Sequence, residues 1–339
     1  MLAGVTIPVL GAAAVAFGAF SLGAQTAPRS RSIEVPDRIS CAACRIEAVS
    51  VIKLGGGTEK EGLIGSDPML ARDSRGRFLI APSANGNDIL VFSKDGRLEQ
   101  TIGRKGKGPG EFEEIRRIWV GPGDSVHVFD WDRYTLFTPD FSVARTSGVG
   151  NLPWDAIFLR NGESIQQKNS AAQNALGYPM HLVSPTGQIR KSFGAERPTF
   201  EVRDGYASYR TLARSSLGGY WSALHTEYRI DRWDTTGVLL QSVRRSVEWF
   251  RPWQGPKRGG PQMFGIREDE SGQLWILISP GPGKTIVEMI DLETGQLVTR
   301  TELPFHTIRF AGDVIWRLTE NPAGEPVVEV MRLLLTSRR

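Results

Sequence analysis

Five strand-and-turn segments of similar sequence recur along this chain, and their repetition limits its fold more than any other feature. Their turn positions lie 45, 46, 50 and 58 residues apart. A further β-rich element that opens with a turn recurs between them, for example at Asp124–Phe129 and Gly272–Leu277. Each unit therefore contains several antiparallel strands, as a blade of a β-propeller does. The turn positions are Gly96, Phe141, Gly187, Gly237 and Gly295.

The number of blades follows from the length of the repeated region. The 291 residues from Arg45 to Leu335 give 48.5 residues per blade for six blades, but only 41.6 for seven, which is shorter than any observed spacing. The last unit, ending in Val327–Leu335, has three strands, and Ile46–Leu54 resembles the outer strand Leu98–Ile102 of the first unit. We therefore predict an all-β fold, a six-bladed β-propeller over residues 45–335, in which the N-terminal strand completes the last blade. We expect residues 336–339 to form a C-terminal tail.

Residues 1–28 carry no charged side chain, and Leu2–Ala24 is almost wholly apolar. About 20 such residues span the core of a bilayer as a helix. We predict a transmembrane or signal helix here, either an uncleaved membrane anchor or a secretory signal cleaved near Gly23. The propeller would then lie on the periplasmic, extracytoplasmic side of the inner membrane, or be soluble in the periplasm. The basic residues that follow favour the opposite orientation; they are Arg29, Arg31 and Arg38.

A linker, residues 29–44, ends in the only cysteine pair, Cys41-Ala-Ala-Cys44. A c-type haem site needs His after the second Cys, where Arg45 stands. A zinc site needs two further ligands nearby, and the sequence offers none. The pair is therefore interpreted as a local disulfide or two unreactive thiols, and export would permit the disulfide.

One glycine-rich stretch, Gly103–Phe112, reads Gly-Arg-Lys-Gly-Lys-Gly-Pro-Gly-Glu-Phe. It resembles the linker between blades in the NHL-like six-bladed β-propeller proteins of bacterial cell envelopes. The motif occurs clearly once here, and a looser similarity covers about residues 45–335. The resemblance implies the fold and an extracytoplasmic location. It implies no single activity.

The sequence offers no convergent set of catalytic, cofactor-binding or metal-binding residues. Gly103–Gly110 precedes a predicted strand rather than a helix, so a structural turn is favoured over a phosphate site. Gly281–Thr285 ends like a P-loop, but Ile278 stands where that motif requires Gly. The histidines occupy different registers of their units, so they are not expected to meet on the propeller axis. They are His127, His181, His225 and His306.

The most distinctive local stretch is Arg244–Gly260, where aromatic and basic residues alternate. Its aromatic side chains either pack beneath their own loop or contact a partner or a membrane surface, because Trp and Arg are common interface anchors. A second, smaller candidate follows Asp130. The candidate interface residues are Trp249, Phe250, Arg251 and Trp253, with Trp131 and Arg133 in the second group.

These features favour a binding role over catalysis. We predict a non-enzymatic, membrane-anchored interaction module, an accessory subunit of a larger membrane complex such as a respiratory or photosynthetic one. The alternatives are a lactonase-like or lyase-like propeller enzyme with an axial metal, and a soluble periplasmic binder of sugar or peptide. The net charge of +4 is spread along the chain, so neither nucleic-acid binding nor self-association is expected.

Overall fold

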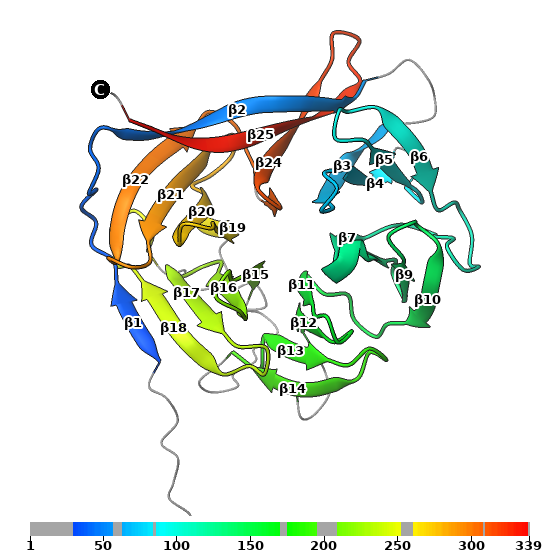
Figure 1. Cartoon of the computed structure of the whole chain (residues 1–339), viewed down its shortest axis with the longest axis horizontal. Helices are drawn as coiled ribbons and strands as arrows, with labels where there is room; N and C mark the ends of the chain where they lie inside the picture. The colour runs from blue at the N-terminus through cyan, green and yellow to red at the C-terminus, as the bar shows by residue number, and fades with distance from the viewer. Residues whose placement is uncertain are drawn as a thin grey trace, which may run out of the picture.

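The computed structural model describes residues 30–56, 63–83, 86–169, 175–194, 209–251, 260–307 and 309–337. Six antiparallel sheets surround one axis, and Figure 1 views the ring along it. The prediction of an all-β, six-bladed propeller is therefore confirmed. The predicted apolar helix over residues 1–28 lies outside the described residues, and within them no helix is long and apolar enough to cross a membrane.

Blades 1 to 5 each have four strands in chain order from the axis outward, and blade 6 takes its outer strand from the start of the chain. Blade 1 comprises β3 (Ile64–Arg72), β4 (Phe78–Ser83), β5 (Ile89–Phe92) and β6 (Leu98–Ile102). Blade 2 comprises β7 (Arg117–Val120), β8 (Val126–Phe129), β9 (Arg133–Phe137) and β10 (Val143–Gly148), with the 3-10 turn η1 (Pro122–Asp124) between the first two strands. Blade 3 comprises β11 (Asp155–Phe158), β12 (Ser164–Gln167), β13 (Met180–Val183) and β14 (Ile189–Phe193).

The second half of the ring repeats this arrangement. Blade 4 comprises β15 (Arg210–Arg214), β16 (Tyr220–Leu224), β17 (Arg229–Trp233) and β18 (Leu239–Arg244). Blade 5 comprises β19 (Gln262–Glu268), β20 (Gln273–Ser279), β21 (Thr285–Asp291) and β22 (Gln296–Leu303). Blade 6 comprises β23 (Phe310–Ala311), β24 (Val314–Glu320), β25 (Pro326–Ser337) and, from the N-terminal side, β2 (Cys44–Gly55).

The repeated turn lies between the third and fourth strands of a blade. All five predicted turn positions have a positive φ, between 66° and 86°. Glycine adopts this left-handed conformation without steric cost, which explains why four of the five copies carry it. Phe141 is the exception, with a φ of 66°.

Strand β2 closes the ring as predicted. It pairs antiparallel with β25 along most of its length, from Cys44 opposite Ser337 to Gly55 opposite Val327. The outer strand of blade 6 thus comes from the start of the chain and the inner three from its end (Figure 1). Because both ends of the propeller share one sheet, the closing blade has no unpaired break between them.

The predicted linker contains a strand that the sequence did not predict. Strand β1 (Arg31–Glu34) pairs in parallel with β18 and forms a fifth, outermost strand of blade 4. The chain then runs to blade 5, where the amide of Ser40 donates to the carbonyl of Leu297 at 2.8 Å. Residues 31–41 therefore form a strap across the outer edges of two blades, which we call the N-terminal strap.

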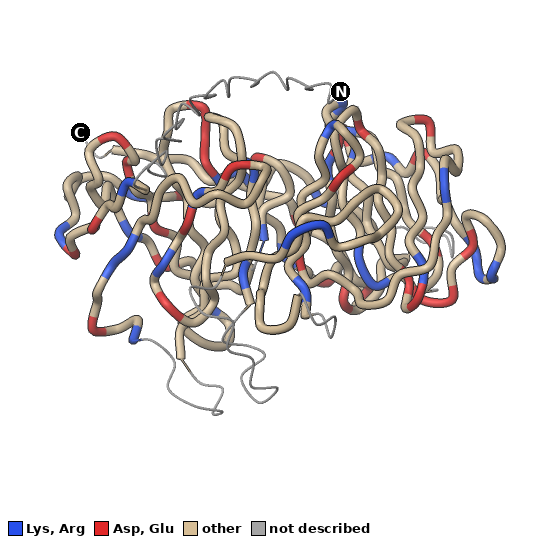
Figure 2. The backbone as a smooth tube through the Cα atoms, turned by 90° about the horizontal axis from the view of Figure 1, so that it is seen from below, with Lys and Arg blue, Asp and Glu red and all other residues tan. Residues whose placement is uncertain are grey.

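The core consists of apolar clusters between neighbouring blades. Six such clusters occur among the described residues, one at each of the six junctions. The cluster between blades 4 and 5 also contains Ile33 and Val35 of the N-terminal strap. Charged residues of both signs are interspersed around the disc rather than gathered in one stripe (Figure 2).

Candidate functional site

A cavity of about 580 Å³ lies on the propeller axis. Its volume is within the range of small-molecule sites, and such sites commonly combine apolar walls with a few polar groups. The first strand of every blade contributes to its wall. These first strands form the inner ring of the propeller in Figure 1. Representative lining residues, one from each of these strands, are Met69, Arg117, Asp155, Leu212, Ile266 and Phe310.

Two arginines that line this cavity, Arg117 and Arg309, contact Trp154. The guanidinium carbon of Arg117, the first residue of β7, lies 5.3 Å from the centre of the Trp154 ring. Arg309, next to β23, donates from Nη2 to the backbone carbonyl of Trp154 at 3.2 Å. Blades 6 and 3 lie on opposite sides of the ring in Figure 1. The Arg309 side chain therefore crosses the axial channel.

Asp155 connects the strands that form the wall of the cavity near these arginines. Its buried carboxylate accepts hydrogen bonds from Trp119 Nε1 at 3.2 Å, from Thr211 Oγ1 at 3.2 Å and from the Leu212 amide at 2.9 Å. These donors belong to β7 and β15, so one side chain joins the inner strands of three consecutive blades. Arg309 Nη1 is 3.7 Å from Asp155, a longer contact than the neutral hydrogen bonds. Asp155 is chiefly a structural group.

An irregularity in β3 brings an acidic group to the same cavity. The pairing of β3 with β4 shifts between Ile64 and Met69, so residues 65–68 bulge out of the ladder. A Cβ on Gly65 would come within 3.0 Å of the carbonyl oxygens of Pro82 and Ser83. Glycine therefore allows this bulge, and Asp67 on it is exposed at the cavity. Bulges of this kind often redirect side chains next to binding sites.

Burial and neighbouring charges both change the pKa of the Arg117 guanidinium. Burial lowers the pKa of its guanidinium, and Arg309 and Arg116 lower this pKa further, whereas Asp155 and Asp67 oppose them. Among the described residues Arg117 forms no ion pair; its Nη1 donates to the carbonyl of Arg116 at 2.7 Å, and its Nε has no partner. Within the described part of the chain, Arg117 thus keeps an unpaired charge at a wall that also carries the carboxylates of Asp67 and Asp155.

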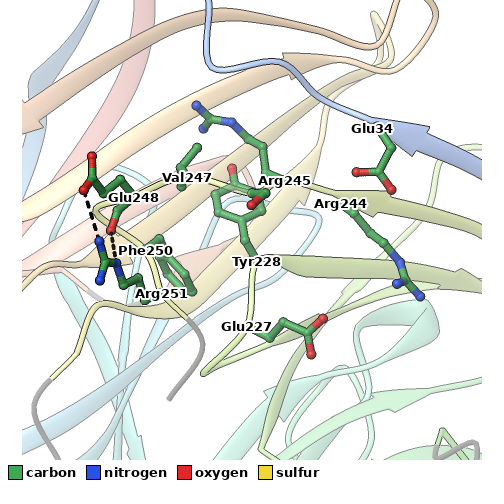
Figure 3. Close-up of a pocket in the computed structure, with 10 residues that line it drawn as sticks. Glu34, Glu227, Tyr228, Arg244, Arg245, Val247, Glu248, Phe250 and Arg251 are labelled. Carbon is green, nitrogen blue, oxygen red and sulfur yellow. Dashed lines mark hydrogen bonds and ion pairs between the residues drawn. The ribbon is translucent and has the colours of Figure 1, made fainter. Parts of the chain in front are cut away.

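A second cavity of about 640 Å³ lies at the rim, beside blade 4, and is shown in Figure 3. Glu34 and Arg244 lie on the opposite side of it from Glu248 and Arg251. The pocket coincides with the start of the aromatic and basic stretch that the sequence singled out. Its open rim carries charges of both signs, so it offers no single ligand chemistry.

Beneath this rim pocket lies a buried network of charges. Arg245 donates to both carboxylate oxygens of Glu288 at 2.6 and 2.7 Å, and Glu288 also accepts from Arg300 Nε at 2.6 Å and from the Tyr228 hydroxyl. Burial opposes the charge on Arg245, but Glu288 outweighs it and raises the pKa of this guanidinium. Asp37 of the N-terminal strap contacts both arginines. The network therefore fastens the strap to blades 4 and 5.

The structure separates the predicted interface residues of the first group. Phe250 is only 2% exposed and belongs to the core between blades 4 and 5, so it is not available to a partner. Trp249 is half-buried and packs against the same core, with the Arg300 guanidinium 4.8 Å from its ring. Arg251 is exposed and pairs with Glu248 at 3.0 Å. Trp253 lies outside the described residues. For Trp249 and Phe250, the interpretation that they pack under their own loop describes the structure best.

The second group behaves differently. Trp131 is 55% exposed, and the Arg116 guanidinium lies 4.2 Å from its ring. Its indole Nε1 donates to Glu114 at 2.9 Å. Arg133, by contrast, donates to the backbone carbonyls of Gly106, Lys107 and Glu111. Arg133 therefore holds the glycine-rich linker in its folded shape, and its guanidinium is engaged within the protein.

That linker is structural in the fold. Glu111 accepts from the amide of Gly108 at 2.8 Å and pairs with Arg104 at 2.7 Å, and Phe112 is buried between blades 1 and 2. Cys41 and Cys44 form a disulfide where the N-terminal strap turns into β2. Within the described ranges, no three His, Cys, Asp or Glu side chains are grouped as a metal site would require.

The axial cavity was not predicted from the sequence. Arg117 and Arg309 are far apart along the chain, and no local motif marks either of them. Only their positions in the blade repeat could have indicated them. Arg117 begins the first strand of blade 2, and Arg309 directly precedes the first strand of blade 6. In a propeller, these positions face the axis.

Comparisons with known proteins agree on the architecture. The chain has the fold of the six-bladed β-propellers. Residues 39–169 match the family model DUF5128, which is described as a 6-bladed beta-propeller. No curated protein matches the chain. The resemblance to NHL-like proteins in particular stays a prediction.

Solved structures resemble the whole propeller. A presumed exported protein of Bacteroides fragilis covers 91% of this chain over its own full length, with a TM-score of 0.62 and 13% identity. A member of the DUF4221 family from Bacteroides vulgatus covers 86%, over 99% of its own length, with a TM-score of 0.61 and 10% identity. Virginiamycin B lyase from Staphylococcus aureus covers 85%, over 88% of its own length, with a TM-score of 0.47 and 15% identity. At these identities the first two similarities show the fold alone, and the third supports no argument.

Proposed function

We propose that this protein is a non-enzymatic, extracytoplasmic interaction propeller that docks on a larger membrane complex as an accessory subunit. The observation that carries this proposal is the continuity between Trp131 and the axial cavity. Arg116 lines that cavity and also lies over the exposed Trp131 ring at 4.2 Å. Exposed Trp and Arg side chains beside an open cavity are typical anchors of binding surfaces.

The location rests on the start of the chain. The apolar residues 1–28 would hold the propeller at the membrane, and the N-terminal strap begins directly after them. The disulfide between Cys41 and Cys44 suits an oxidising compartment such as the periplasm. An accessory subunit in this position would present the face that carries Trp131 to its partner.

The test is purification from native membranes in mild detergent, followed by identification of the proteins that co-migrate. We expect the wild-type chain to elute in a complex, and the Trp131→Ala variant to lose about 30-fold or more in affinity for it, as truncation of a Trp anchor does. The control is Leu217→Ala. Leu217 is 75% exposed and lies in the first-to-second strand turn of blade 4, whereas Trp131 lies in the second-to-third strand turn of blade 2. These two kinds of turn lie on opposite faces of the disc. Elution of the wild-type chain alone at its monomer mass would contradict the proposal.

A second candidate is a soluble periplasmic binder of a small ligand, and the volume of the axial cavity favours it. In that case residues 1–28 are a signal that is removed. Sequencing the N-terminus of the native protein separates the two candidates, because cleavage near Gly23 would remove the anchor. A retained Met1 supports the membrane-held module.

A further inference from the structure

We propose that Arg117 and Arg309 form a binding site for a single carboxylate group at the axial cavity. This inference rests on the proposed binding function and names the chemistry that the cavity recognises. The group belongs either to a free organic acid or to an Asp or Glu side chain of a partner protein. Both sources offer the same planar anion to the two guanidinium groups.

The first support is the convergence of the two arginines on Trp154. Arg117 lies over its ring, and Arg309 crosses the channel to its backbone carbonyl. Both residues line the axial cavity. An aromatic ring beneath a guanidinium holds that group in a fixed plane, which prepares its edge for a planar anion.

The second support is the incomplete use of these charges inside the protein. Arg117 has no ion pair within the described residues, and its Nε has no hydrogen-bond partner. Arg309 has one distant carboxylate at 3.7 Å, and Asp155 is already satisfied by neutral donors. An unpartnered Nε alone is weak evidence, since several arginines of this chain share it. At the axial cavity, however, Arg117 shares a wall that a ligand can reach with a second cation, Arg309.

The third support concerns the charge of the anion. Asp67 is exposed on the bulge of β3 and lines the same cavity. Glu114 lines it too, but is paired with Arg116 at 2.5 Å. A carboxylate carries one negative charge, whereas phosphate carries up to two near neutral pH. Asp155 also lines the cavity, so two carboxylates already face the two guanidinium groups. Because these carboxylates repel a dianion more strongly than a monoanion, the cavity favours carboxylate over phosphate.

The experiment is calorimetric titration of the purified propeller at low salt with three probes. They are 3-phenylpropionate, the blocked peptide Ac-Gly-Gly-Glu-Gly-Gly-NH2 and inorganic phosphate. We expect one of the two carboxylate probes to bind more tightly than phosphate, and the tighter one identifies the source. Arg117→Gln should weaken this binding about 10-fold or more, because it removes charge-assisted hydrogen bonds. Arg117→Lys should give an intermediate loss, since Lys keeps the charge without the planar fork.

The matched control is Arg145→Gln. Arg145 on β10 also has an unpartnered Nε and lies 5.5 Å from an aromatic ring, that of Tyr134, but it is not part of the axial cavity. Its substitution should leave carboxylate binding unchanged. A thermal melt of each variant verifies that the fold is kept. Tighter binding of phosphate, equal binding by the Arg117→Gln variant, or no binding of either carboxylate would overturn the inference.

The two proposals fail separately. If a membrane complex co-purifies through Trp131 while neither carboxylate probe binds, the carboxylate site is wrong and the interaction module stands. If no complex is found but 3-phenylpropionate binds through Arg117, the module is wrong and the soluble binder is favoured.

Discussion

Glu288 lies at the centre of the buried charge network, and its surroundings determine what its loss would cost. Its carboxylate faces Arg245, Arg300 and the hydroxyl of Tyr228, all from neighbouring strands or turns. Burial, followed by the charge of Glu288, raises the pKa of Tyr228 well above its usual value. That hydroxyl therefore remains a neutral donor throughout the physiological range, and Glu288 is the acceptor that satisfies it.

We expect Glu288→Gln to lower the free energy of unfolding by about 3–5 kcal/mol, because it leaves the buried Arg245 without its principal counter-charge. Equilibrium unfolding in urea measures the change. The control is Glu302→Gln, on the adjacent strand β22, where the pair with Lys284 is exposed on both sides. That substitution should cost less than about 1 kcal/mol. Similar losses for the two variants would show that the network contributes little.

Among the elements, the N-terminal strap shows how an edge is covered. Ile33 of β1 is 7% exposed and packs in the core between blades 4 and 5, whereas Ile39 is 36% exposed. Strand β1 thereby pairs with the otherwise open edge of β18. Open edges are prone to pair with other chains, so the strap protects the outer rim of two blades.

Ile33→Ala should destabilise the propeller by about 2–5 kcal/mol, the usual cost of a buried cavity of that size. Ile39→Ala, on the same strap, should cost about 0.5 kcal/mol or less. Unfolding midpoints compare the two, and hydrogen exchange of the β18 amides shows whether the strap has detached. If Ile33→Ala leaves both measurements unchanged, the strap is not an integral part of the fold.

The elements also show what a sequence can predict. The blade repeat could be predicted because the turn between the third and fourth strands needs a residue with a positive φ. Glycine therefore recurs at regular intervals, for example at Gly187 and Gly237. The closing strand β2 was readable because it repeats the pattern of an outer strand. Strand β1 has four residues with a single buried side chain, and its parallel partner β18 lies two hundred residues away. No local sequence pattern predicts a pairing between segments so far apart. The proximity of Arg117 and Arg309 could not be predicted for the same reason.

At the scale of the whole molecule, ring closure makes every junction between blades part of one structure. Both ends of the propeller meet in blade 6, and each neighbouring pair of blades shares an apolar cluster. A group that must ionise inside one junction therefore acts on the stability of the entire ring. Three histidines supply such groups: His127 and His181 are buried, and His225 is half-buried against Tyr209 and Phe264.

Stability should consequently fall as the pH drops below about 6.5, the ordinary pKa of histidine. Burial lowers the pKa of His127 and His225 to about 3 and that of His181 to about 4. His127 stacks on Phe158 at the junction of blades 2 and 3, and His181 is bonded to the Lys168 carbonyl at 3.0 Å. In the unfolded chain these side chains titrate near pH 6.5, so between about pH 6.5 and 4.5 only the unfolded state takes up their protons. The stability that these neutral histidines allow is fully present above pH 6.5, and it is lost as the pH falls below that value.

The free energy of unfolding should fall by up to about 1.4 kcal/mol per pH unit for each histidine in this window. Urea unfolding at pH 7.5, 6.0 and 5.0 measures this change. His181→Gln should reduce the slope by the amount due to one histidine, while the Gln side chain still supplies a donor for the Lys168 carbonyl. Carboxylates with a lowered pKa, such as Glu268, add to the loss only below about pH 4.5, so they do not contribute between pH 7.5 and 5.0. A free energy of unfolding that stays constant from pH 7.5 to 5.0 would mean that these histidines protonate within the folded ring, and that the junctions between blades admit water.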